Sequence, residues 1–297
     1  MTAPHPHEEV LADVRAGAFA LAYRMLGSVA EAEDVVQEAL LRLHAALEAG
    51  EEIRSPRAYA TTVTTRLAID QLRSARRTRE QYVGDWLPEP LLTDGGADGD
   101  PARAAELSDS LSVAFLVLLE QLSPRQRAAL LLHDVFDYGY DEVAAIIGSS
   151  EAAARQLASR ARRHVEDGRP RFDASRERRD ELARRFFAAA RDGDMHALEA
   201  LLAEDVVLQG DGGGKVPALA RALHGRTRVA RTVSAWGRHG ARLGISLHPA
   251  EVNGQPGAVM RGAQGEVIGV MTVEVAGGEV VGVRSVVNPE KLGHVPG

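Results

Sequence analysis

The chain has 297 residues, a net charge of −7 and no cysteine. Its length suggests two or three domains, and its shares of apolar (45%) and charged (26%) residues are typical of folded chains rather than disordered ones. The lack of cysteine excludes disulfide frameworks, thiolate metal sites and thiol nucleophiles. Apolar runs are far shorter than the roughly 18 residues of a membrane span, and the N-terminus has no signal-peptide pattern, which fits a cytoplasmic protein.

Charge is distributed unevenly along the chain. A net negative charge argues against indiscriminate binding to nucleic acid. Two short stretches are nevertheless basic: Arg66 to Arg79 holds five arginines against the single acid Asp70, and Arg155 to Arg163 holds four arginines and no acid. Local basic helices in an acidic chain are typical of a protein that touches DNA only when a partner presents it.

Residues 10–80 are predicted to be helical. Gly27 ends a first helix, and Ser28 with Glu31 matches a capping box at the start of a second helix. Ser55-Pro56 predicts the start of a third helix, because serine is favoured at the N-cap and proline at the first helical position. A fourth, shorter helix is expected through QLRSARRTR.

A linker and a second helical part follow. The segment 84–101 is rich in proline, glycine and acid, which excludes a long helix or a core strand. Its tryptophan indicates that the linker docks onto a surface, because a large exposed apolar ring is unfavourable. Residues 106–166 are predicted to be helical, with SPRQ at Ser123 matching a capping box.

Residues 177–297 change to an α+β pattern. Two helices are split by Asp192-Gly193-Asp194, and a third helix is expected from about Arg226 to Arg238. Five segments read as strands, and glycine gathers after residue 205 as turn-rich β structure requires. The pattern predicts a domain with a curved antiparallel sheet.

A helix-turn-helix is predicted within residues 137–165. Ser149 is the expected cap of its second helix, and Gly139 is a weaker cap for its first. The shared core is expected at Val143, Ala144, Ile147, Leu157 and Ala161. The outer face of the second helix carries side chains that read base edges and phosphates: Arg155, Gln156, Ser159, Arg160 and Arg163. The alternative is a pair of helices with a solvated arginine face.

The helix EAEDVVQEALLRL has a polar face opposite its valine and leucine core. Asp34, Gln37, Glu38 and Leu41 fall at helical spacing on that face. By composition alone this face is a solvated acidic surface. The order of parts favours a binding surface instead, because an arginine-rich helix and then a helix-turn-helix follow it.

These segments resemble a known family. FALAYRMLGSVAEAEDVVQEALLRL and SPRAYATTVTTRLAIDQLRSARR resemble region 2 of the bacterial extracytoplasmic-function (ECF) sigma factors. LLEQLSPRQRAALLLHDVFDYGYDEVAAIIGSSEAAARQLASRARRHV resembles their region 4. Three further motifs are similar to those of the subgroup with a fused SnoaL-like domain: WLPEP at 86–90, DGGGK at 211–215 and NPEKL at 288–292. The subgroup usually has Asp where this chain has Glu290.

The resemblance implies a multidomain fold. It places sigma region 2, an all-α helical bundle, at 8–80, a linker with the WLPEP motif at 81–105, and the all-α region 4 helix-turn-helix at 106–168. Residues 176–297 would form an α+β cone of the NTF2-like, SnoaL-like type.

The resemblance also assigns roles to matching positions. It implies that Asp34, Gln37, Glu38 and Leu41 bind the β′ clamp helices of core RNA polymerase, whose β flap is a further partner. Melting and reading of the promoter −10 element would fall to Arg66, Asp70, Arg73, Arg76 and Arg77. The −35 element would be read by Arg155, Gln156, Ser159, Arg160 and Arg163. A regulatory contact between domains would involve Trp86, Leu87, Pro88, Glu89, Pro90, Asp211, Lys215, Asn288, Pro289, Lys291 and Leu292.

We therefore expect a cytoplasmic sigma factor, a monomer when free, that binds RNA polymerase and promoter DNA and is regulated in cis by its C-terminal domain. No metal, cofactor or membrane contact is expected, and ligand binding is left open. One alternative makes the C-terminal domain an isomerase or cyclase, with acid–base groups drawn from Asp205, Asp211, His224, His239 and His248. The domain lacks the tyrosine that commonly serves such enzymes as an oxyanion donor. Another is a DNA-binding regulator that acts without polymerase.

Overall fold

The computed structural model describes residues 6–93, 110–168 and 175–297, except for the side chains of 6–9, 75–80 and 167–168. Its contacts divide the chain into two compact units. The first holds the helices up to residue 80 together with residues 118–168, and the second holds the described part of 81–117 together with 175–297. Among the described helices, none is both long and apolar enough to cross a bilayer.

Three long helices open the first unit: α1 (Pro6–Leu26), α2 (Val29–Glu48) and α3 (Pro56–Glu80). The Oγ of Ser28 accepts a hydrogen bond from the Glu31 amide at 3.2 Å, and Ser55 caps α3 in the same way. The predicted break into a fourth helix is wrong, because α3 is continuous. No glycine or proline interrupts it, and Ala68, Ile69 and Leu72 are buried along one face.

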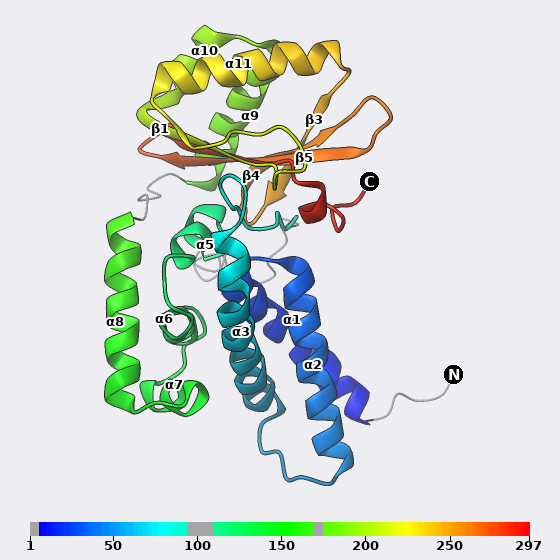
Figure 1. The fold of residues 1–297 in the computed structure, drawn as a ribbon, viewed down its shortest axis with the longest axis vertical. Coiled ribbons are helices and arrows are strands. Elements are labelled where there is room, and N and C mark those ends of the chain that lie inside the picture. Colours follow the sequence, from blue (N-terminus) through cyan, green and yellow to red (C-terminus); the bar gives the residue numbers. More distant parts are fainter. Residues whose placement is uncertain (1–5, 94–109, 169–174) are drawn as a thin grey trace. The chain divides into compact units, whose positions relative to one another are not determined.

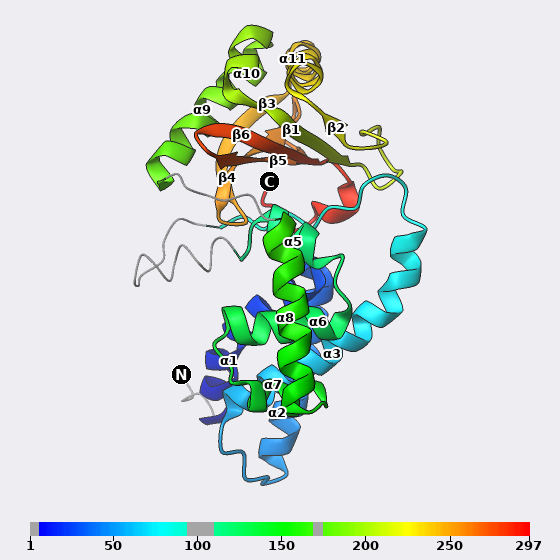
Figure 2. The same ribbon diagram turned by 90° about the vertical axis from the view of Figure 1, so that its left-hand side faces the viewer.

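The helix-turn-helix lies in the same unit, after α5 (Val113–Leu119) and α6 (Pro124–Leu130). The Ser123 capping box of α6 is present in full. A π-helical turn that the sequence pattern did not indicate follows at Leu131–Val135. The two helices of the motif are α7 (Tyr140–Ile147) and α8 (Glu151–Gly168), packed beside α6 (Figures 1 and 2).

Two details of the helix-turn-helix differ from the expectation. Ser150, not Ser149, caps α8, because its Oγ accepts the Ala153 amide hydrogen bond at 3.2 Å. Leu157 is half-buried, while Ala154 and Ala158 on the same helix are fully buried. Small side chains at the contact allow α8 to approach α6 and α7 closely.

The second unit contains a cone of three helices over one sheet. The helices α9 (Arg176–Asp192), α10 (Met195–Leu201) and α11 (Arg226–Arg242) lie over the same face of the sheet (Figures 1 and 2). The strands are β1 (Leu202–Asp211), β2 (Leu223–His224), β3 (Ser246–Val252), β4 (Gln255–Arg261), β5 (Val267–Ala276) and β6 (Glu279–Val286). Their order is β2-β1-β6-β5-β4-β3, and the short turn η2 (Pro289–Lys291) follows.

The sheet is mixed, so the prediction of an antiparallel sheet is wrong at one pair. β1 and β6 are parallel, with Leu208 opposite Val283, and the other neighbours are antiparallel. Parallel neighbours need a long connection rather than a hairpin turn. The chain between β1 and β6 supplies it with β2, α11 and the three strands β3 to β5.

The two faces of the sheet bury different partners, because side chains alternate along a strand. On the helix side, Met271 and Val283 join a core with Phe186 and Val229. A second apolar cluster contains residues of the strands, the linker and the C-terminal tail: Leu87, Val252, Val259, Val270, Val286, Leu292 and Val295. The linker and the tail are thus built into this unit's packing.

Candidate functional site

The expected polymerase-binding face on α2 is open to solvent. Asp34, Gln37, Glu38 and Leu41 are all exposed, and Leu41 is 57% exposed although leucine is usually buried. Glu38 pairs with Arg42 on the same helix at 2.7 Å. An exposed leucine on the same helix face as the carboxylates of Asp34 and Glu38 offers both apolar contact and charge to a basic partner.

The arginines of α3 occupy different surroundings. Arg66 donates hydrogen bonds to the carbonyl oxygens of Ala145 and Ile146, at the end of α7, at 3.1 and 3.0 Å. Arg73 forms an exposed ion pair with Asp70 at 3.1 Å. The side chains of Arg76 and Arg77 lie outside the described part.

The residues expected to read the −35 element lie on the exposed face of α8, where their spacing predicted them. Arg155, Gln156, Arg160 and Arg163 are exposed, and Ser159 is half-exposed. Arg155 pairs with Glu151 at 2.7 Å and lies over the Tyr140 ring at 4.8 Å.

The helix-turn-helix part is anchored to the first three helices within the first unit. Arg127 is 2% exposed and donates to the Met25 carbonyl oxygen in the last turn of α1 at 2.6 Å. Tyr138 donates to the Thr61 hydroxyl on α3 at 3.0 Å. Together with the bonds from Arg66 of α3 to α7, these bonds hold the two helices expected to read the promoter, α3 and α8, in one packed body.

A buried carboxylate ties the linker to the α+β domain. Asp211, at the end of β1, has a side chain with no exposure. It accepts hydrogen bonds from the Tyr82 hydroxyl at 2.6 Å, the Leu87 amide at 2.9 Å and the Gly213 amide at 3.0 Å. Burial and the bond to Asp211 raise the pKa of the Tyr82 phenol.

Lys291 completes this cluster, which we call the linker clamp: Tyr82, Trp86, Leu87, Asp211, Asn288 and Lys291. The Lys291 Nζ lies 2.7 Å from the Asp211 Oδ2 and donates to the Leu87 carbonyl oxygen at 2.5 Å. It also lies 4.2 Å from the Trp86 ring centroid and 4.9 Å from the Tyr82 ring centroid, within the range of a cation–π interaction. The ammonium is thus held between a carboxylate and two aromatic faces.

The tail orients the clamp. The Asn288 side-chain Nδ2 donates to the Tyr82 hydroxyl at 2.9 Å, and the Asn288 backbone N–H donates to the Asp211 carbonyl oxygen at 3.0 Å. Gly213 has a φ of +59°, and a Cβ there would lie 2.3 Å from the Asn288 Nδ2. Glycine is therefore required where the DGGGK loop passes over the NPEKL turn.

The rest of the linker is fixed by further bonds. Leu92 forms an antiparallel bridge with Val252. The Asn253 side chain accepts from the Leu91 amide at 3.0 Å, and His294 bonds the Pro90 carbonyl oxygen at 2.7 Å. Pro88, Glu89 and Pro90 are buried.

The structure brings together most of the predicted regulatory residues, with one exception. Lys215 forms an exposed ion pair with Glu290 at 2.9 Å rather than joining the clamp. Tyr82, Asn253 and His294 are contacts that sequence reasoning missed. Tyr82 stands four residues before Trp86, and this aromatic pair in a proline-rich linker is the signal that was available.

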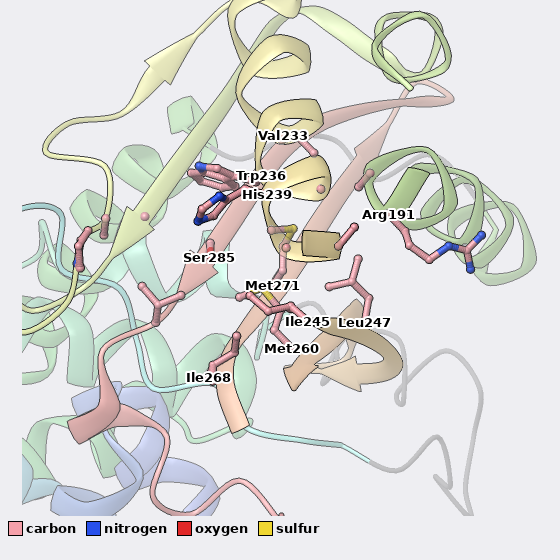
Figure 3. Close-up of a pocket in the computed structure, with 18 of the residues that line it drawn as sticks. Arg191, Val233, Trp236, His239, Ile245, Leu247, Met260, Ile268, Met271 and Ser285 are labelled. Atoms are coloured by element: carbon pink, nitrogen blue, oxygen red, sulfur yellow. The ribbon is translucent and has the colours of Figure 1, made fainter. Parts of the chain in front are cut away.

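The C-terminal domain contains a partly open cavity of about 410 Å³ between α11 and the sheet (Figure 3). Of the expected acid–base candidates, only His239 lines it. Asp205, His224 and His248 are exposed elsewhere, and all the described donors of Asp211 belong to the clamp or its loop. Within the described residues, no group of three His, Asp or Glu side chains is arranged to hold a metal ion.

Comparison with known proteins decides the family. Three family models match: Sigma-70 region 2 at residues 12–78, Sigma-70 region 4 at 112–165 and a SnoaL-like domain at 183–287. The ECF RNA polymerase sigma factor SigJ of Mycobacterium tuberculosis is 40% identical, covering 93% of this chain and 90% of that protein. The chain belongs to the ECF RNA polymerase sigma factors. SigI of the same organism, a probable ECF sigma factor, is 32% identical over 92% of this chain and 90% of that one.

The similarity to SigJ extends from the sequence to the fold. The crystal structure of M. tuberculosis SigJ matches with a TM-score of 0.76 and 37% identity, covering 96% of this chain and 97% of that one. α1 to α3 are therefore region 2, α6 to α8 lie in region 4, and the cone is the SnoaL-like domain. As a member of this family the protein binds RNA polymerase and promoter DNA in transcription initiation, which is not an enzymatic function.

Proposed function

We propose that this sigma factor is regulated in cis by its SnoaL-like domain through the linker clamp. The observation that carries the proposal is the buried contact of Asp211 and Lys291 with residues 82–87 of the linker. That linker joins region 2 to region 4, so its attachment to a third domain limits how far the two promoter-binding regions can separate. The protein would act as a monomer in the cytoplasm, where RNA polymerase works.

Promoter binding requires that separation. Elements at −35 and −10 are about 25 base pairs apart, or roughly 85 Å of B-DNA at ~3.4 Å per base pair. In the described structure, Arg66 of α3 is 3.0 Å from the Ile146 carbonyl oxygen in region 4. A packed body of this kind cannot span both elements, so the bonds of Arg66, Arg127 and Tyr138 must break when the protein engages a promoter.

The exposure of these residues supports the roles that we propose for them. The exposed α2 face that holds Asp34, Glu38 and Leu41 would contact the β′ clamp helices, since an apolar anchor beside charged groups suits a protein interface. The exposed α8 face would read the −35 element. Arg66 and Arg73 would contact the −10 element once Arg66 leaves α7. The β flap would be a further contact of region 4.

In vitro transcription with core polymerase tests the regulatory proposal. A chain that ends at Val287 loses Asn288 and Lys291, and we expect more transcript than from the full chain because the linker is released. A chain that ends at Ser175 loses the whole domain and exposes the linker's apolar side chains, so we expect less transcript. Equal transcript from all three chains contradicts regulation in cis.

An isomerase or cyclase role for the SnoaL-like domain is the second candidate. The structure does place a tyrosine beside a carboxylate, Tyr82 on Asp211. This pair is buried in the clamp, however, and the residues described as lining the cavity include no Asp or Glu. His239 is the one acid–base candidate in the described lining, and no described hydrogen bond orients its ring as a general base requires. We therefore propose that the domain acts by binding and not by acid–base chemistry.

A further inference from the structure

The cavity of the SnoaL-like domain has the size and lining of a small-molecule site. Its volume of about 410 Å³ falls within the usual range of ligand pockets, about 300–1,000 Å³. Its wall is formed largely by apolar side chains from α11 and the sheet, labelled in Figure 3: Val233, Ile245, Leu247, Met260, Ile268 and Met271. Flexible methionines let such a wall adapt to different ligand shapes.

A few polar groups interrupt this wall. Trp236 and His239 lie side by side on α11, and Ser285 of β6 is labelled across from them (Figure 3). Among the described residues, the side chains of these three have no hydrogen-bond partner. Arg191 is the one charged side chain in the lining, and its guanidinium points away from the cavity, where it pairs with Asp192. The cavity therefore favours a neutral ligand with a ring and a single polar group.

The same cavity shares its wall with the linker clamp. Gly210 lines the cavity and is followed by Asp211, and Val287 lines it and is followed by Asn288. The Val287 amide donates to the Asp211 carbonyl oxygen at 2.8 Å. A ligand in the cavity would therefore contact the backbone segments that position two clamp residues.

Leu219 provides a second link. It lines the cavity, and its amide nitrogen would lie 3.3 Å from a Cβ at Gly210. Its carbonyl oxygen would lie 3.7 Å from a Cβ at Gly84 of the linker. The same backbone segment therefore contacts the cavity, β1 and the linker beside the clamp.

We propose that the cavity binds a neutral, mostly apolar molecule carrying a ring and one hydrogen-bonding group, and that this ligand holds the linker clamp closed. Gly210 and Val287 of the cavity wall directly precede the clamp residues Asp211 and Asn288, so opening the clamp would alter that wall. A ligand that fits the cavity of the closed form would therefore bind that form preferentially and shift the population toward it. The coupling rests on the proposed regulation in cis, whereas the binding site does not. Such a molecule would act as a corepressor of the sigma factor.

Binding is tested with the full chain and the neutral probe prodan, a naphthalene ketone whose emission rises and shifts to the blue in apolar sites. We expect saturable binding to the wild-type protein. Filling the cavity with Ile268→Trp, or with Ile245→Phe should the first variant not fold, is expected to weaken binding at least tenfold. The matched control Ala200→Trp adds the same ring at an exposed position of α10, outside the lining, and should bind like wild type. Equal affinities in all variants overturn the site.

Coupling is tested with the clamp variant Lys291→Met. Linkage is reciprocal, so a ligand that favours the closed clamp must bind more weakly when the clamp is broken, by about fivefold or more at typical coupling energies. Unchanged prodan affinity in Lys291→Met, with normal binding to wild type, overturns the coupling. This result can be told apart from a failure of regulation in cis. Regulation in cis is measured without prodan, by comparing transcription from the full chain and the truncated chains.

Discussion

Replacement of Lys291 by methionine tests how much the linker clamp contributes to the stability of the second unit. Methionine keeps much of the apolar length of lysine but removes the ammonium from the Asp211 carboxylate, which has no exposure and retains three other hydrogen-bond donors. Loss of one partner from a buried ion pair typically costs about 3–5 kcal/mol. The three remaining donors favour the low end, about 3 kcal/mol.

The expected result is a lower thermal midpoint for the second unit. For a folded unit of about 150–250 residues, each kcal/mol shifts the midpoint by about 2–4 °C, so Lys291→Met should lower it by roughly 6–12 °C in differential scanning calorimetry. The chain offers a matched control, since it has only two lysines. Lys215 is 54% exposed in its pair with Glu290, and an exposed pair contributes at most about 1 kcal/mol. Equal midpoints for Lys291→Met and Lys215→Met would refute the buried clamp.

Three further predictions concern the other sites. Asp34→Ala with Glu38→Ala should weaken capture of core polymerase with an unchanged circular dichroism spectrum, because exposed carboxylates contribute little stability; wild-type capture would remove this assignment. Arg155→Ala or Arg160→Ala should reduce promoter-specific transcription by the equivalent of about 1–3 kcal/mol per base contact while core binding persists; normal initiation by both argues against the −35 role. Because the folded protein raises the pKa of Tyr82, the stability this residue contributes is complete below about pH 10, the ordinary tyrosine value, and declines above it. The stability difference between wild type and Tyr82→Phe should therefore shrink in alkaline titrations, and a constant difference contradicts the clamp role.

Local signals in the sequence predicted the helical parts well. The capping box at Ser123 is observed bond for bond, and the spacing of Asp34, Glu38 and Leu41 placed them correctly on an exposed face of α2. Such features depend on residues three or four apart, so a short pattern contains all the information. The family motifs predicted a contact between the linker and the DGGGK loop, and the structure shows it through Asp211.

Contacts between distant segments were beyond such patterns. Tyr82 and Asp211 are separated by 129 positions, and no local rule specifies their pairing. The parallel neighbours β1 and β6 depend on how the whole chain returns to the sheet. The continuity of α3 depends on the burial of Ala68 and Leu72, which overrides the weak break that the sequence suggested. In each case tertiary packing decides what short-range preference leaves open.

Amine labelling measures the opening of the clamp most directly. Lys291 is 8% exposed and Lys215 is 54% exposed, and these are the only lysines in the chain. Brief acetylation followed by mass spectrometry should modify Lys215 quickly and Lys291 slowly in the free protein. In a transcribing complex with core polymerase and promoter DNA, the account predicts that Lys291 becomes reactive relative to the free protein, because the linker has left the SnoaL-like domain. Undiminished protection of Lys291 in a complex that initiates transcription would contradict it.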